Sequence, residues 1–481
     1  MELKNKVVKG VFWSATERFG MLGLQTVISL LLTRWLAPGD FGAVAILTSF
    51  SVVANLIVDS GFAQALIRKQ DANATDYASV FYLNIAIAFV GYLILVAITP
   101  LIALRYGAQM IAYGAVLFLT LPLNAIGLVQ NTILTKEMNF KALTRISLTS
   151  STTAGIIALI LAFAGFGTWA IITQLVIYSL CRTSMLCYTR RWRPEARFSS
   201  PAIRALFRFS SRLFAADLLN NLYIGVTQLW IGGRYQTAEL GLYSQAQKLR
   251  DMFVNTITGA VQNVTYPALS TLQDDPVKLR ESYRKVLIVI AFLVFPAMAG
   301  LIAVAENMFD ALLNPKWMPA VPYFRMLCLI GLMMPIISVN MNALKVKGRS
   351  NLFLRVEIIS KTLFVVTLLA TIRYGVAAII WGQVICSFAA LLIGMGFSGQ
   401  QLGYRLDRQC LDLLPYLLLA ITVWASASGI NYIMDGFNVW AKLGIQILTG
   451  TSIYVCLALV CRVEAWRDVT TIVREILAKH K

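Results

Sequence analysis

The chain has 481 residues, of which 58% are hydrophobic and only 14% are charged. Soluble domains carry about 25% charged residues, so this composition excludes a soluble protein and indicates a membrane protein. A net charge of +19 would suggest nucleic acid binding in a soluble chain. In a membrane protein it indicates basic cytoplasmic loops instead, and we expect no nucleic acid partner.

Metal and redox chemistry are not indicated by the sequence. The seven cysteines lie mostly inside apolar runs and form no C-x-x-C pair, which argues against a zinc site and against a disulfide framework. His480 is the one histidine of the chain, so no histidine proton relay is available in the membrane. We therefore expect no metal and no cofactor.

The predicted elements are membrane-spanning helices, each of about 20 mainly apolar residues. The short basic N-terminus runs into an apolar stretch without a small-residue cleavage site, which predicts a first membrane helix rather than a cleaved signal peptide. Fourteen spans are predicted in chain order. They cover residues 10–33, 41–66, 77–104, 108–133, 145–164, 167–189, 207–232, 241–269, 286–305, 319–344, 351–372, 375–398, 412–432 and 438–461.

The basic residues of the loops predict the orientation. When the loops are numbered alternately from the inside, 29 Lys and Arg residues fall in inside segments and 6 in outside segments. Because such a bias marks the cytoplasmic side, both termini are predicted to be cytoplasmic, in a multi-pass protein of the bacterial inner membrane. All loops are short, the longest being 190–206 and 270–285, so no loop holds an enzyme domain.

The basic stretch from Arg190 to Arg208 divides the chain near its middle and predicts an amphipathic helix on the membrane surface. The fold class is thus all-α and polytopic, with two six-helix lobes around a central cavity and two additional helices. Such a pair of lobes indicates alternating access around a midplane site. The predicted parts are an N-terminal lobe (1–193), a cytoplasmic amphipathic linker (194–206), a C-terminal lobe (207–400), spans thirteen and fourteen (401–461) and a cytoplasmic tail (462–481).

Charged side chains inside the spans are the candidate functional residues, because each is costly in lipid and has to face protein or a watery cavity. Polar residues follow one helical face in spans one, seven and eight. The candidates for binding a substrate are Arg18, Gln25, Arg212, Asn220, Asn221, Lys248 and Arg250. Glu17, Asp217 and Asp251 are candidates for balancing charge or for coupling to Na⁺ or H⁺, and Asp59, Arg325, Glu357 and Lys361 are secondary candidates.

Structural roles are open for several of these residues. Arg182 and Arg212 lie near cytoplasmic ends of spans, where they can extend to the surface. Asp59 can cap or end span two, and Glu17 can neutralise Arg18. Glu357 and Lys361 are spaced as a helical ion pair. By contrast, Arg250 and Asp251 are adjacent, so they are expected to point in different directions and need not pair, whereas Asp251 and Lys248 share a face.

Eight segments of the chain resemble one known family, in family order through spans one to eleven. They are WSATERFG (13–20), LAPGDFGAVA (36–45), DSGFAQALIRK (59–69), ADLLNNLYIG (216–225), GLYSQAQKL (241–249), YPALSTLQDDPVKLRESYRK (266–285), NPKWMPAVPYFRMLCL (314–329) and KGRSNLFLRVEIISK (347–361). The chain resembles the Wzx-type polysaccharide flippases, especially WzxC-like lipopolysaccharide and exopolysaccharide exporters of the multidrug/oligosaccharidyl-lipid/polysaccharide exporter superfamily.

The resemblance implies a function for the candidate residues. Members of this family turn undecaprenyl-pyrophosphate-linked oligosaccharide repeat units from the cytoplasmic to the periplasmic leaflet. Arg18, Lys248 and Arg250 are then expected to contact the pyrophosphate. By the same analogy the lipid tail is expected in a groove beside spans thirteen and fourteen, where Leu413–Ala425 and Leu443–Val460 are almost free of charge. Membrane lipid and other polysaccharide assembly proteins are the further expected partners.

Three other functions compete with a flippase. An ion-coupled multidrug or organic-cation antiporter of the same fold needs a cavity dominated by carboxylates, but bases are at least as numerous as acids in spans one, seven and eight, where the two lobes are expected to meet. A polymerase or ligase is expected to carry a large periplasmic loop, and a non-transporting scaffold leaves the charges in the spans unexplained. The P-loop signature is missing, so the expected energy source is an ion gradient, the membrane potential or removal of the product. The sugar repeat unit, the coupling ion and the oligomeric state are not specified by the sequence.

Overall fold

The computed structural model describes residues 2–69, 71–434, 436–461 and 463–467. It does not describe the side chains of residues 2–9, 11, 208–209, 212–213, 215–217, 219–220, 222–224, 260–264, 266–268, 350 and 432. Within the described part the chain is helical, and it divides into two compact units, Met1–Ser244 and Gln245–Lys481.

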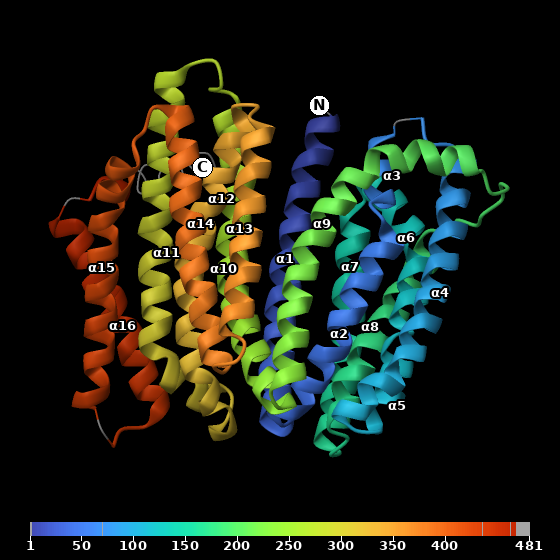
Figure 1. The fold of residues 1–481 in the computed structure, drawn as a ribbon, viewed down its shortest axis with the longest axis horizontal. Helices are drawn as coiled ribbons and strands as arrows, with labels where there is room; N and C mark the ends of the chain where they lie inside the picture. The colour runs from blue at the N-terminus through green and yellow to red at the C-terminus, as the bar shows by residue number, and fades with distance from the viewer. Residues whose placement is uncertain (1, 70, 435, 462, 468–481) are drawn as a thin grey trace. The chain divides into compact units, whose positions relative to one another are not determined.

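Unit 1 is a bundle of helices (Figure 1). They are α1 (Glu2–Trp35), α2 (Pro38–Asp59), α3 (Phe62–Arg68), α4 (Ala74–Tyr106), α5 (Gln109–Leu117), α6 (Thr120–Lys136), α7 (Phe140–Phe163), α8 (Thr168–Thr189) and α9 (Ser200–Arg234). Helix α7 packs against α1 and α8, and α9 packs against α2, α3 and α4. Unit 1 thus includes the seventh predicted span, which the sequence analysis assigned to the C-terminal lobe; the lobe boundaries stay a prediction.

Two predicted spans are each broken into two helices, for local reasons. In span two, Ser60 and Gly61 both have positive φ (43° and 72°), which ends α2 and starts α3. Gly61 also lies against α9, because a Cβ there would be 3.0 Å from the Cβ of Ser210. In span four, Pro122 stands in the first turn of α6. A proline lacks the N–H for the bond to residue 118 and its ring would clash with that carbonyl, so α5 ends before it.

The start of α10 (Thr237–Ser270) is in backbone contact with the start of α2. A Cβ on Gly42 would lie 1.8 Å from the carbonyl oxygen of Thr237, and a Cβ on Gly241 would lie 1.8 Å from that of Pro38. Only glycine permits helices to approach so closely. The two glycines belong to two of the segments that carry the family resemblance, and the structure explains why glycine is needed in both.

The linker differs from its prediction. Residues 190–199 are not helical, so the expected surface helix from Arg190 to Arg208 is wrong in its first half. Pro194 disfavours helix at the residue before it, and Ser199 caps α9 by accepting a hydrogen bond from the Ala202 N–H. Figure 1 shows the first turns of α9 running crosswise over one end of the unit before the helix bends along it.

Unit 2 contains most of α10 and the remaining helices. They are α11 (Pro276–Leu312), the 3₁₀ helix η1 (Pro315–Ala320), α12 (Val321–Val346), α13 (Ser350–Thr371), α14 (Val376–Leu402), α15 (Leu406–Ile433) and α16 (Val439–Val460). Helix α12 packs against α11 and α14, and α13 packs against α14. Helices α15 and α16 pack against each other and against the long helix α11, so within this unit they form a pair on one side of it (Figure 1).

Every predicted span falls on one helix or on two successive helices of the described chain. Among the described residues, ten helices or helix pairs are both long and apolar enough to cross a membrane. Large apolar side chains are exposed along them, such as Phe89 and Leu104 on α4 and Leu448 on α16. Exposed apolar surface on this scale is expected of a helix that faces lipid. The protein is therefore a multi-pass helical membrane protein; the membrane crossing of α1, α9, α10 and α13 stays a prediction.

Candidate functional site

Packing against α7 buries part of the predicted polar face of α1 and leaves another part exposed. Ile28 and Ser29 are buried, and Gly155 of α7 lies directly against Ile28. Glu17 accepts a hydrogen bond of 2.6 Å from the Ser147 hydroxyl of α7, so its carboxylate is bound to a neighbouring helix of the same unit. Arg18 and Gln25 are exposed, as a side chain that meets a substrate has to be.

Three of the predicted site residues lie outside the described side chains. These are Arg212, Asp217 and Asn220, whose backbone belongs to α9. Their neighbour Asn221 is half-buried on the same helix. That the two lobes meet at spans one, seven and eight stays a prediction.

On α10, the structure contradicts the expected orientation of Arg250 and Asp251. Arg250 Nη2 lies 2.6 Å from Asp251 Oδ1, although the two residues are adjacent. Adjacent residues on a helix point in different directions at their Cα atoms, but the long arginine side chain reaches back to its neighbour's carboxylate. Arg250 is only 5% exposed and packs inside unit 2 against Gly331 of α12, whereas Lys248 is exposed. The described contacts thus make Arg250 a buried charge that Asp251 balances.

The secondary candidates have structural roles or stay open. Asp59 accepts a hydrogen bond of 3.3 Å from the Ala63 N–H, so it caps α3. Arg325 forms an ion pair of 3.1 Å with Glu306. Glu357 and Lys361 are half-buried on α13, and their pairing stays a prediction. Arg182 donates a hydrogen bond of 2.9 Å to Asn131 of α6, which gives it a partner within unit 1.

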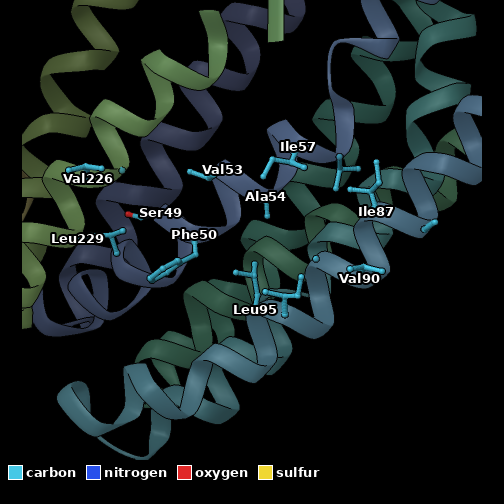
Figure 2. Close-up of a pocket in the computed structure, with 15 residues that line it drawn as sticks. Ser49, Phe50, Val53, Ala54, Ile57, Ile87, Val90, Leu95, Val226 and Leu229 are labelled. Carbon is cyan, nitrogen blue, oxygen red and sulfur yellow. The ribbon is translucent and has the colours of Figure 1, made fainter. Parts of the chain in front are cut away.

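An apolar pocket of about 640 Å³ lies in unit 1 among α2, α4 and α9. Figure 2 shows Phe50, Val53 and Ala54 of α2 on one side of it and Leu95 of α4 on another. Sequence reasoning missed this pocket, because a run of apolar residues has the same pattern whether it lines a groove or packs against a neighbour. Its lining suits a hydrocarbon chain.

A second pocket, of about 710 Å³, is polar and lies in unit 2. Its lining comes from four helices, α11, α12, α15 and α16, and includes Glu306, Asn307, Arg325, Trp424, Asn431 and Lys442. The sequence analysis recognised only Arg325 among these residues. Asn431, a polar amide within the apolar run of span thirteen, was a sequence signal that could have pointed to this pocket.

A basic pocket of about 450 Å³ lies at the linker and is lined by Arg190, Arg191, Trp192 and Arg193. Trp192 holds this segment in place by packing edge-on against Phe81, with ring centroids 5.4 Å apart. The lining also includes Glu195, and Arg190 forms an ion pair of 2.8 Å with Glu137. The lining still carries more positive than negative charge, which suits an anionic head group at a membrane surface. This part of the predicted linker is therefore an ordered basic segment although it is not a helix.

The end of unit 2 that contains Tyr283 is held by a buried polar network. The Tyr283 hydroxyl meets Asn340 of α12, Ser398 of α14 at 3.1 Å and Gln409 of α15 at 3.4 Å, all fully buried. The next residue, Arg284, forms ion pairs of 2.8 Å with Asp412 and 2.9 Å with Glu464. These contacts fasten α15 and the segment after α16 to α11. Among the described residues, no group of three or more His, Cys, Asp or Glu side chains is placed to hold a metal ion.

The sequence is similar to those of known polysaccharide biosynthesis proteins. The sequence profile of the family described as "Polysaccharide biosynthesis protein" matches residues 31–322. The chain is 30% identical over 324 residues to the succinoglycan biosynthesis transport protein ExoT of Rhizobium meliloti, covering 67% of this chain and 66% of ExoT. It is 24% identical over 435 residues to the lipopolysaccharide biosynthesis protein WzxC of Escherichia coli, covering 89% of this chain and 83% of WzxC.

A solved structure shares the fold. The lipid II flippase MurJ in an inward closed conformation superposes with a TM-score of 0.74 at 13% identity, over 96% of this chain and all of that chain. At this identity the likeness concerns the fold alone. Together with the profile match over more than half of the sequence, it confirms the expected family and fold class: the chain belongs to the polysaccharide biosynthesis protein family, with WzxC among its relatives.

Proposed function

We propose that this protein is a flippase for lipid-linked oligosaccharides. It moves undecaprenyl-pyrophosphate-linked repeat units from the cytoplasmic to the periplasmic leaflet of the bacterial inner membrane, by alternating access of two helical lobes. The single observation that carries the proposal is the combination of family membership over residues 31–322 with a MurJ-like fold across nearly the whole chain. The named relatives act in the biosynthesis or transport of polysaccharides.

The polar end of such a substrate needs cations. Arg18 on α1 and Lys248 on α10 are exposed charged side chains within predicted membrane spans, which are mainly apolar. A charged side chain inside a membrane span is expected to have a function, because it is costly to keep there. A guanidinium group binds phosphate through two parallel hydrogen bonds. Arg18 and Lys248 are therefore our pyrophosphate ligands, whereas Arg250 is better explained as the buried partner of Asp251.

The lipid tail of the substrate needs an apolar surface that opens to the bilayer. The pocket among α2, α4 and α9 offers an apolar surface, with Ile57, Ile87 and Val90 in its lining (Figure 2). It replaces the groove beside spans thirteen and fourteen as our proposed tail site, because the described pocket at α15 and α16 is polar. Each methylene buried there contributes about 0.8 kcal/mol.

The ion pair of Arg250 with Asp251 bears on energy coupling. A carboxylate that already neutralises a buried guanidinium is a poor site for a coupling Na⁺ or H⁺, because removing it leaves the arginine uncompensated. We therefore assign Asp251 a positioning role. Glu17, which accepts a hydrogen bond from Ser147, and Asp217 are the remaining candidates for coupling.

The proposal is tested in a strain lacking the protein and in sealed vesicles. Cells without it should accumulate a lipid-linked saccharide in the cytoplasmic leaflet, and vesicles containing the purified chain should move that lipid. Arg18→Ala should reduce transport at least about tenfold, Arg18→Lys should restore part of it because charge is kept but the planar fork is lost, and the exposed Arg280→Ala should behave as wild type. Transport of an organic cation in place of the lipid would overturn the proposal in favour of an antiporter.

The tail site has its own test. Gly91 lines the apolar pocket, and nothing lies within 4 Å of a Cβ built on it. Gly91→Phe should fill the pocket without disturbing the helix and should slow transport. Gly444→Phe places the same ring at an equally open glycine on α16 and should not. Equal transport by both variants would exclude this pocket as the tail site.

A further inference from the structure

The polar pocket of unit 2 is preorganised. Asn307 Nδ2 donates hydrogen bonds of 2.7 Å to Asn431 Oδ1 and of 2.8 Å to Gln446 Oε1, and Gln446 Nε2 donates to the Ala427 carbonyl at 2.9 Å. Gln446 is fully buried. Burying amides between membrane helices is unfavourable unless they bond one another. The network therefore holds the Asn307 and Asn431 side chains in fixed orientations at the pocket wall.

The pocket carries one more positive charge than negative charge in its described lining. Glu306 and Arg325 pair at 3.1 Å, and Arg325 Nε also donates to the Ile302 carbonyl at 3.2 Å. Lys442 of α16 adds a second cation. The side chains of Glu306 and Arg325 are 46% and 36% exposed, so their charges reach the pocket. The lining thus favours an anionic ligand that also offers hydroxyl groups to a carboxylate.

Trp424 of α15 supplies an aromatic surface. It lines the pocket and is 46% exposed, so its ring is available to a ligand. An aromatic face stacks against the C–H face of a sugar ring while polar groups beside it bond the hydroxyls. Amides in fixed orientation, a carboxylate, two cations and an exposed indole are together the groups that recognise an acidic sugar.

We propose that this pocket binds an anionic saccharide on the product side of the membrane. It lies at the end of unit 2 where α11 ends and where α15 connects to α16, which is the periplasmic end on the predicted topology. The inference rests on the proposed function in one respect, that the saccharide belongs to the class of cargo the flippase moves. The site receives the sugar portion after translocation, apart from the pyrophosphate ligands proposed above.

Binding is measured on the full chain in lipid nanodiscs with trigalacturonate as the probe. Saturation-transfer NMR should show contact with the wild-type protein, and titration should give an affinity that Trp424→Ala and Lys442→Gln each weaken about tenfold, as expected of anchor residues in a binding site. Trp381→Ala is the matched control, since Trp381 is 47% exposed on α14 and does not line the pocket. The neutral trisaccharide maltotriose should bind at least tenfold more weakly.

The outcomes separate this inference from the proposed function. Trigalacturonate binding that neither pocket variant weakens, or maltotriose binding of equal strength, overturns the inference. So does a wild-type protein that transports the lipid-linked saccharide but binds no trigalacturonate. A protein that binds trigalacturonate through Trp424 and Lys442 but transports no lipid-linked saccharide upholds the pocket and contradicts the flippase assignment.

Discussion

Replacing Asp251 by Asn is expected to destabilise unit 2 strongly, because it leaves the Arg250 guanidinium buried without its counter-charge. The Arg250 side chain is 6% exposed, its Nη2 lies 2.6 Å from the Asp251 carboxylate, and its Nε has no hydrogen-bond partner among the described residues. Removing one member of a buried ion pair costs about 3–5 kcal/mol. Since the Asp251 side chain is itself 31% exposed, solvent screening reduces this free-energy cost, and we expect the lower end of that range.

The double variant distinguishes burial from function. Arg250→Met keeps an unbranched side chain and removes the charge, so it leaves only the half-exposed carboxylate of Asp251 unpaired. Combining it with Asp251→Asn removes both charges, and the double variant should be more stable than Asp251→Asn alone. A coupling free energy of at least about 2 kcal/mol between the two sites is expected for groups in direct contact.

Cys328 provides the assay. Its thiol is fully buried on α12, one turn before the Gly331 position that packs against Arg250. In a background where the other six cysteines are replaced, the rate of maleimide labelling reports the opening of this region. Asp251→Asn should raise that rate roughly 100-fold, since about 1.4 kcal/mol corresponds to a factor of ten.

The exposed Asp310→Asn on α11 is the control and should label as wild type does. Wild-type labelling of Asp251→Asn, or a double variant that labels as fast as the two single effects combined, would refute the view of a buried pair. Polysaccharide export, measured in parallel, decides the role of Arg250. The double variant should still export polysaccharide. A double variant that folds but does not export would support Arg250 as a pyrophosphate ligand.

Three further predictions concern the fold. Tyr283→Phe should destabilise unit 2 by about 1–3 kcal/mol, because it removes the hydroxyl from a fully buried network; thermal unfolding of the purified protein measures this, and an unchanged midpoint would contradict it. Gly241→Ala should cost at least about 2 kcal/mol through overpacking, since its Cβ would lie 1.8 Å from the Pro38 carbonyl oxygen, whereas Gly23→Ala, which meets nothing within 4 Å, should be neutral by the same measurement. A reporter active only in the periplasm should be silent when fused after Lys481, and activity there would show that an even number of spans is wrong.

The sequence by itself determined the class of the protein, the helices and the family. Long apolar runs are a local property, because any segment of about 20 such residues is stable across a bilayer as a helix. The loop charges predict an orientation on equally local grounds. Turn chemistry was also readable, as Asp59 shows: the DSG sequence predicted an end of span two, and the carboxylate does cap the next helix.

Tertiary structure alone decided which polar residues are buried and which are exposed. Arg18 and Arg250 have similar surroundings in the sequence, yet Arg18 is exposed and Arg250 is enclosed by α12 and held by Asp251. Asn307 lies far along the chain from Asn431 and Gln446, and the three form a network only because α11, α15 and α16 pack together. A sequence pattern specifies the face of a helix, but the neighbour that covers this face comes from contacts between distant segments, which local periodicity does not contain.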